Sequence, residues 1–143
     1  MIDEKITPAW QAGDELPAQT LEPVTRLKLI TYAGASGDYN PIHTIDQAAA
    51  DAGLNGVIQH GMLTMAELGR LFSPYQEEGY IRRFETRFTG MVFVGDALTV
   101  GGKVTGVERR TEGTDYLCDV YATNQKGQTV ATGRVTFQSM AHP

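Results

Sequence analysis

The chain has 143 residues, of which 41% are hydrophobic and 20% are charged. These values predict one folded domain over residues 1–143, with residues 1–10 as a loose lead-in, rather than a disordered chain. The 17 acidic side chains outnumber the 12 basic ones, and the formal net charge of −5 argues against a nucleic-acid-binding protein.

The location of the protein is predicted from its cysteine content and its N-terminal composition. Cys118 is the single cysteine, which excludes an intrachain disulfide and a zinc site built from several cysteines. The N-terminus is acidic and lacks the basic start and apolar run of a secretory signal. No apolar run reaches the roughly 18 residues that a spanning helix needs. We therefore expect a cytoplasmic protein that does not associate with a membrane.

The first half of the chain predicts one strand and short helices. Residues 15–22 favour a strand, and Thr25 is suited to cap the N-terminus of the next helix. Glycine, aspartate, asparagine and proline then cluster in residues 36–41, a composition typical of a turn. Residues 46–52 predict a second short helix that ends at Gly53.

Residues 61–72 predict a third helix that is almost entirely apolar. Its polar side chains Thr64, Glu67 and Arg70 are spaced by three and form one narrow stripe. A helix that is apolar on nearly every side is buried on nearly every side. We therefore expect the rest of the chain to wrap around it.

The second half of the chain changes to a period of two, which is typical of strands. Strands are predicted at residues 80–89, 96–107, 114–124 and 128–139. With the first strand they give a sheet of about five strands, and helices followed by strands indicate an α+β protein. Glycine weakens a strand unless the sheet bends or another backbone passes close. A curved sheet around the central helix would explain four glycines within these strands: Gly101, Gly102, Gly106 and Gly133.

The turn after the first helix contains a candidate acid–base pair. Asp38 and His43 lie five residues apart on a loop that Pro41 stiffens, so their side chains can meet in one site. Imidazole titrates near neutral pH, and a carboxylate can orient it or share its proton transfers. The alternative is that these residues only form and cap a turn.

A second candidate lies where the apolar helix begins, at residues 59–62. The first N–H groups of a helix lack intrahelical partners, and this end of the helix is electropositive. Gly61 has no side chain to block a ligand carbonyl, so its N–H can stabilise developing negative charge. The alternative is that Gly61 permits close packing of the helix on the sheet. Met62 is a candidate substrate contact, and a plain core position is the alternative.

Three motifs resemble those of one family. They are Gly-Asp-x-Asn-Pro-x-His at residues 37–43, His-Gly-Met-Leu at residues 60–63 and Val-Gly-Asp at residues 94–96. In this order they resemble MaoC-like (R)-specific enoyl-CoA hydratases and 3-hydroxyacyl-thioester dehydratases. The resemblance extends from about residue 8 to residue 137, nearly the whole chain.

The resemblance implies a fold, a reaction and roles for particular residues. The fold is the hot dog, a long central helix wrapped by a curved antiparallel sheet. The reaction is the reversible hydration of 2-enoyl thioesters to (R)-3-hydroxyacyl thioesters. The family's catalytic pair falls on Asp38 and His43, and its donor to the thioester carbonyl falls on the backbone of Gly61. Asn40 and His60 are expected to support the site.

The resemblance also bears on cofactors and partners. It implies no cofactor and no metal, although Asp38, His43 and His60 could supply three ligands. The expected substrate is an acyl-CoA or acyl carrier protein thioester. We expect a homodimer, with a heterodimer as the alternative, because hot-dog domains pair their sheets edge to edge.

Two other functions remain open from the sequence. A hot-dog thioesterase shares the fold but needs a carboxylate on the central helix, for which Glu67 is the candidate. A non-catalytic protein that binds acyl thioesters, or the partner subunit of a heteromeric dehydratase, is the second. The presence of both Asp38 and His43 favours a catalytic chain.

Overall fold

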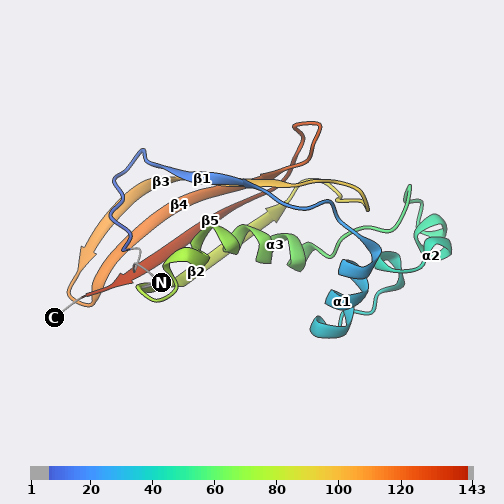
Figure 1. The fold of residues 1–143 in the computed structure, drawn as a ribbon, viewed down its shortest axis with the longest axis horizontal. Coiled ribbons are helices and arrows are strands. Elements are labelled where there is room, and N and C mark those ends of the chain that lie inside the picture. The colour runs from blue at the N-terminus through green and yellow to red at the C-terminus, as the bar shows by residue number, and fades with distance from the viewer. Residues whose placement is uncertain (1–6, 142–143) are drawn as a thin grey trace, which may run out of the picture.

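A computed structural model describes residues 7–141, so residues 1–6 of the predicted lead-in lie outside the described residues. Five strands and three α-helices follow the predicted order (Figure 1). Two 3-10 helices, Pro41–His43 and Arg70–Tyr75, extend the helical part. The other elements are β1 (Glu15–Thr20), α1 (Arg26–Ser36), α2 (Asp46–Asp51), α3 (Gly61–Gly69), β2 (Gly79–Phe88), β3 (Thr99–Arg110), β4 (Gly113–Thr123) and β5 (Thr129–Met140).

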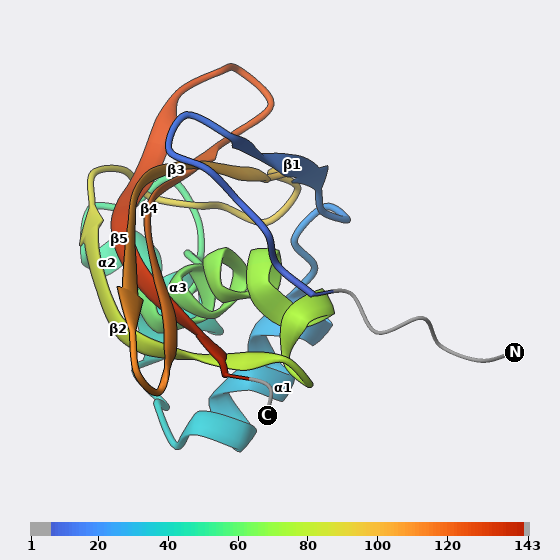
Figure 2. The ribbon, with the colours of Figure 1, turned by 90° about the vertical axis from the view of Figure 1, so that its left-hand side faces the viewer.

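The five strands form one antiparallel sheet in the order β1-β3-β4-β5-β2. The sheet curves around α3, while α1 and α2 lie beyond one end of it (Figures 1 and 2). This arrangement confirms the predicted α+β class and the wrapped central helix. Both strand boundaries and helix boundaries lie within a few residues of those predicted.

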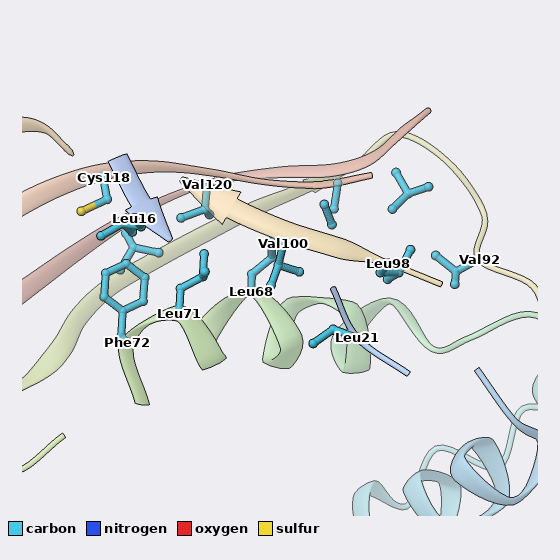
Figure 3. Packing of buried hydrophobic residues seen from close by; sticks show 14 of the residues in the cluster. Leu16, Leu21, Leu68, Leu71, Phe72, Val92, Leu98, Val100, Cys118 and Val120 are labelled. Carbon is cyan, nitrogen blue, oxygen red and sulfur yellow. The ribbon is translucent and has the colours of Figure 1, made fainter. Parts of the chain in front are cut away.

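Apolar side chains from α3 and the following 3-10 helix fill the space under the sheet. Leu68, Leu71 and Phe72 are at most 3% exposed and point toward the strands (Figure 3). Val100 of β3 and Val120 of β4 face them from the sheet. Burial of these side chains stabilises the fold, and it fixes the C-terminal half of α3 against the sheet.

The start of the described chain is also packed. The Trp10 ring lies edge-on to Tyr75 and to Tyr116, with ring centroids 4.7 and 5.0 Å apart. The Tyr116 hydroxyl donates a hydrogen bond to the carbonyl of Pro8 at 3.0 Å. Trp10 therefore belongs to the packed fold, although the predicted loose lead-in included it.

The polar stripe of α3 is largely buried. Thr64 and Glu67 are each only 3% exposed, whereas Met62 is 58% exposed. The buried polar atoms have partners on other segments, which helical periodicity does not reveal. The α-helix also ends at Gly69 instead of residue 72, and the chain continues as a 3-10 helix that contains Pro74.

Two strand glycines allow neighbouring backbones to approach closely. A Cβ atom on Gly102 would lie 2.8 Å from the carbonyl oxygen of Asp119, and one on Gly133 would lie 2.6 Å from that of Glu85. Both residues face the inside of the sheet, where Gly133 is paired with Thr86 and Val120. These glycines therefore allow the tight curvature that the sequence predicts.

Among the described residues, no helix combines the length and the apolar character needed to cross a lipid bilayer.

We expect Gly133→Ala to lower the free energy of unfolding by about 1–3 kcal/mol, because the added methyl group would overlap a backbone carbonyl. Gly34→Ala is the matched control, since a Cβ atom there meets nothing within 4 Å and the residue lies inside α1. It should raise the free energy of unfolding by about 0.5–1 kcal/mol. Urea unfolding of both variants measures the difference, and equal stability of the two would contradict the close-approach explanation.

Candidate active site

The loop after α1 is held by its own side chains. Gly37 ends α1 in the left-handed conformation, at a φ of 74°, and its N–H donates to the carbonyl of Ala33. The Asn40 N–H donates to Asp38 Oδ1 at 3.2 Å, and Asn40 Oδ1 accepts from the N–H of Ile42 at 3.3 Å. Asn40 thus caps the short helix that carries His43.

The loop brings the two predicted acid–base residues together. Asp38 Oδ2 lies 3.7 Å from His43 Nε2, and the Asp38 side chain is 50% exposed whereas that of His43 is 9% exposed. On the other side of the ring, His43 Nδ1 lies 2.8 Å from the carbonyl oxygen of Ile58. A carbonyl only accepts, so Nδ1 carries the hydrogen and Nε2 of neutral His43 presents a lone pair to Asp38.

His60 contacts both members of this pair. Its Nε2 lies 3.1 Å from the Asp38 carbonyl oxygen, so Nε2–H donates there, and its ring stacks on His43 with centroids 3.9 Å apart. Tyr32 contacts the His60 ring edge-on at 4.8 Å. Burial lowers the pKa of His60 below its ordinary value of 6.5, and the proximity of His43 lowers it further. His60 therefore favours the neutral form.

The third predicted group lies beside the histidines, where α3 begins at Gly61. His60 is the N-cap of α3 and its side chain makes no capping hydrogen bond, so the electropositive end of the helix is not closed by its own cap. A Cβ atom on Gly61 would lie 3.3 Å from the Phe88 ring. The absence of a side chain at Gly61 therefore permits close packing against Phe88, which was the alternative role. The same position is also suited to bind a carbonyl, because the N–H groups at the helix start are not capped.

Phe88 is a site residue that the sequence does not identify. It is 47% exposed and its ring covers the side of Gly61, next to the first turn of α3. In the sequence it is one of several apolar residues with a period of two in a strand, so nothing separates it from the core. Met62, also exposed, is not the core residue given as its alternative.

The ligand atoms of Asp38, His43 and His60 lie within 4.8 Å of one another. The two imidazole rings stack with 23° between their planes. His43 Nδ1 and His60 Nε2 are engaged with backbone carbonyls, which leaves His43 Nε2 and His60 Nδ1 open. A histidine that binds a metal ion commonly engages its other ring nitrogen in this way, so the arrangement fits both acid–base chemistry and a set of metal ligands.

A groove of about 1190 Å³ lies elsewhere on the sheet. It is lined by residues of all five strands, both exposed and buried, and contains none of the predicted site residues. Cross-strand pairs of opposite charge line it, including Lys103 with Asp119 and Asp119 with Arg134. The candidate site is therefore located by its chemical groups and not by the size of this groove.

The fold and site define a hot-dog protein with a polar loop over the N-terminal end of its central helix. Residues 9–126 match the family described as MaoC like domain, and the chain belongs to this dehydratase family. The R-hydratase PhaJ1 of Pseudomonas aeruginosa is similar in structure, with a TM-score of 0.80 and 25% identity over 93% of this chain and 84% of that one. These similarities confirm the hot-dog fold.

Two further proteins are similar over different lengths. The fatty acid synthase subunit beta of Aspergillus oryzae is 41% identical over 96 residues, which is 59% of this chain but only 5% of that protein. This chain therefore spans a small fraction of the curated relatives that it matches. The ChsH1–ChsH2 complex of Mycobacterium tuberculosis shares the fold, with a TM-score of 0.79 and 20% identity over 92% of this chain and 98% of that one.

We expect His60 to make stability depend on pH. The pKa of His60 in the folded chain lies below the ordinary value of 6.5. Between these two values the unfolded chain therefore binds more protons at this residue than the folded chain does. Its contribution to the free energy of unfolding is present above about pH 6.5 and is lost as the pH falls toward the folded pKa. Urea unfolding between about pH 7.5 and pH 5 should show a smaller loss for His60→Gln, which keeps a donor, than for the unaltered chain. Identical pH profiles would contradict the assignment.

Proposed function

We propose that this chain catalyses the reversible hydration of 2-enoyl thioesters to (R)-3-hydroxyacyl thioesters. The observation that carries the proposal is the 3.7 Å separation of Asp38 Oδ2 and His43 Nε2 beside the open end of α3. This separation exceeds a direct hydrogen bond and suits two acceptors that share one water molecule. Membership of a dehydratase family supports the same reaction.

The two acceptors orient the water for attack. When Asp38 is a carboxylate and His43 is neutral, the water donates one hydrogen to each, which leaves an oxygen lone pair free for C3 of the substrate. Because the Asp38 side chain is half exposed, a ligand can reach the water between Asp38 and His43 from solvent. The N–H of Gly61 donates to the thioester carbonyl and stabilises the enolate that forms as C3 is attacked.

Proton transfer completes the addition. The water oxygen bonds to C3, one water proton passes to the Asp38–His43 pair, and the pair returns one proton to C2. The sum is one water added across the double bond, and the reverse path expels it. His43 suits the proton transfer because its Nδ1–H is fixed by the carbonyl of Ile58, which aims Nε2 at the water.

The geometry favours this reaction over thioester hydrolysis. A thioesterase of this fold needs a free carboxylate on α3 beside the thioester. Glu67 is 3% exposed, and both of its carboxylate oxygens are bonded, one to Lys28 and the other to Gln59. A carboxylate enclosed in this way is poorly placed to attack a ligand.

We propose a thioester of coenzyme A or of an acyl carrier protein as substrate, within fatty-acid metabolism. The name of the A. oryzae relative supports that area of metabolism. We further propose a homodimer joined through β2, because β2 is an edge strand and its exposed Tyr80 and Phe88 would be covered by a second copy. The alternative is a heterodimer, and the similar chain in the ChsH1–ChsH2 complex is an example of a chain of this fold in a complex of two named proteins.

Asp38→Asn and His43→Gln should each lower the turnover of crotonyl-CoA hydration by about 100-fold or more, because an amide side chain cannot take a proton from the water. Loss of the enoyl absorbance measures the rate, and circular dichroism checks folding. Near-normal rates in both folded variants would overturn the mechanism. Release of free thiol at the rate of substrate loss would instead indicate a thioesterase.

Sedimentation equilibrium at micromolar concentration should give a mass twice that of one chain. An exposed, unpaired edge strand favours association with a second edge. A monomeric mass for an active enzyme would contradict the homodimer. A monomeric, inactive chain would direct the search toward a different partner chain.

A further inference from the structure

A buried ionic network joins α1 to α3 behind the candidate active site. Glu67 of α3 is 3% exposed, and its carboxylate accepts from two donors. The Lys28 ammonium of α1 donates to Oε1, and the Gln59 amide donates to Oε2 at 3.0 Å. Both carboxylate oxygens are used, so the charge is paired although it is removed from water.

Gln59 links this network to the site. Its Nε2 donates to Thr64 Oγ1 at 2.9 Å as well as to Glu67, so both amide hydrogens are engaged. Its backbone N–H donates to the carbonyl of Val92 at 2.7 Å. The next residue in the chain is His60, which holds the Asp38 carbonyl. The side chain of Gln59 thus fixes the backbone from which His60 and the first turn of α3 begin.

Lys28 links the network to the other half of the site. It lies on α1, which leads through Gly37 directly to Asp38. Only Leu29 and Ala33 of α1 are buried, so few apolar contacts orient this helix. The ion pair with Glu67 is therefore a major constraint on where α1, and the loop that follows it, lie relative to α3.

The network requires a carboxylate at position 67. Lys28 and the Gln59 amide nitrogen are donors only, so the group between them must accept from both sides. A glutamine at this position offers one accepting oxygen and one donating nitrogen. The charge that pairs with Lys28 would be lost, and the glutamine nitrogen could bond to Gln59 only if the Gln59 amide turned to present its unpartnered Oε1.

We propose that Glu67, Lys28 and Gln59 are positioning residues that set the separation between the Asp38–His43 pair and the N–H of Gly61. The proposal rests on the proposed hydration, in which the water must be held at C3 while the carbonyl next to C2 is bound by the Gly61 N–H. Displacement of one group by about 1 Å can cost up to 100-fold in rate. These residues act without touching the substrate.

Glu67→Gln tests the proposal by a split between kcat and KM for crotonyl-CoA hydration. We expect kcat to fall at least about tenfold while KM changes less than about threefold, because geometry and not binding is lost. Lys28→Arg, which keeps the cation, should retain most of kcat. A folded Glu67→Gln variant whose kcat stays within about twofold of the unaltered enzyme would overturn the proposal.

Asp115→Asn is the matched control for stability. Asp115 is an equally buried carboxylate, 1% exposed, and accepts from Arg82 and Arg110 at 2.7 Å each. It lies near the hairpin between β3 and β4, at the end of the sheet away from α1 (Figure 1). It should lose thermal stability as Glu67→Gln does but keep kcat. An equal loss of kcat in both would overturn the proposal, because it would show a general effect of stability.

Two further measurements keep the test decisive. If Glu67→Gln does not fold, the double variant Lys28→Met with Glu67→Leu removes both charges, and retention of its kcat would overturn the proposal.

If the unaltered chain hydrates no enoyl thioester, the proposed function fails, and the imidazole NMR signals of His43 and His60 still report the geometry. These signals should shift in Glu67→Gln but not in Asp115→Asn, and unchanged signals in both would overturn the positioning role.

Discussion

The buried carboxylate of Glu67 is the interaction on which the arrangement of the helical half depends. A charge on the inner side of α3 is tolerated only where donors surround it, and here they come from α1 and from the segment before α3. This requirement brings together segments that are 39 residues apart in the chain. Apolar packing alone would permit several orientations of α1, since that helix buries little of its surface.

The two halves of α3 are held by different forces. Leu68 and the residues that follow it are fixed by the apolar interior of the sheet, whereas the first turn is fixed by polar contacts of Gln59, Thr64 and Glu67. The division fits the role proposed for the start of α3. Apolar burial excludes ligands, so a helix end that is to bind a carbonyl needs an anchor that leaves its N–H groups accessible.

Local sequence patterns predict much of the fold and part of the candidate site. Thr25 accepts from the N–H of Lys28 as an N-cap does, and the period of two locates four of the strands. Asp38 and His43 are predicted to meet because a short loop joins them. The burial of Glu67 and the place of Phe88 against Gly61 could not be predicted, because both depend on segments that are distant in sequence. A polar residue at helical spacing has the same pattern whether it faces water or a lysine on another helix.

The two stacked histidines differ in what surrounds them. His60 is 1% exposed, its Nε2–H is bonded to the Asp38 carbonyl, and its Nδ1 has no partner among the described residues. A second proton would place a desolvated cation against His43, which is why burial lowers the pKa of His60. His43 instead turns its Nε2 toward the Asp38 carboxylate, 3.7 Å away. A neutral His60 therefore adds no charge to the stack, and in the proposed hydration His43 is the ring whose open nitrogen faces the water.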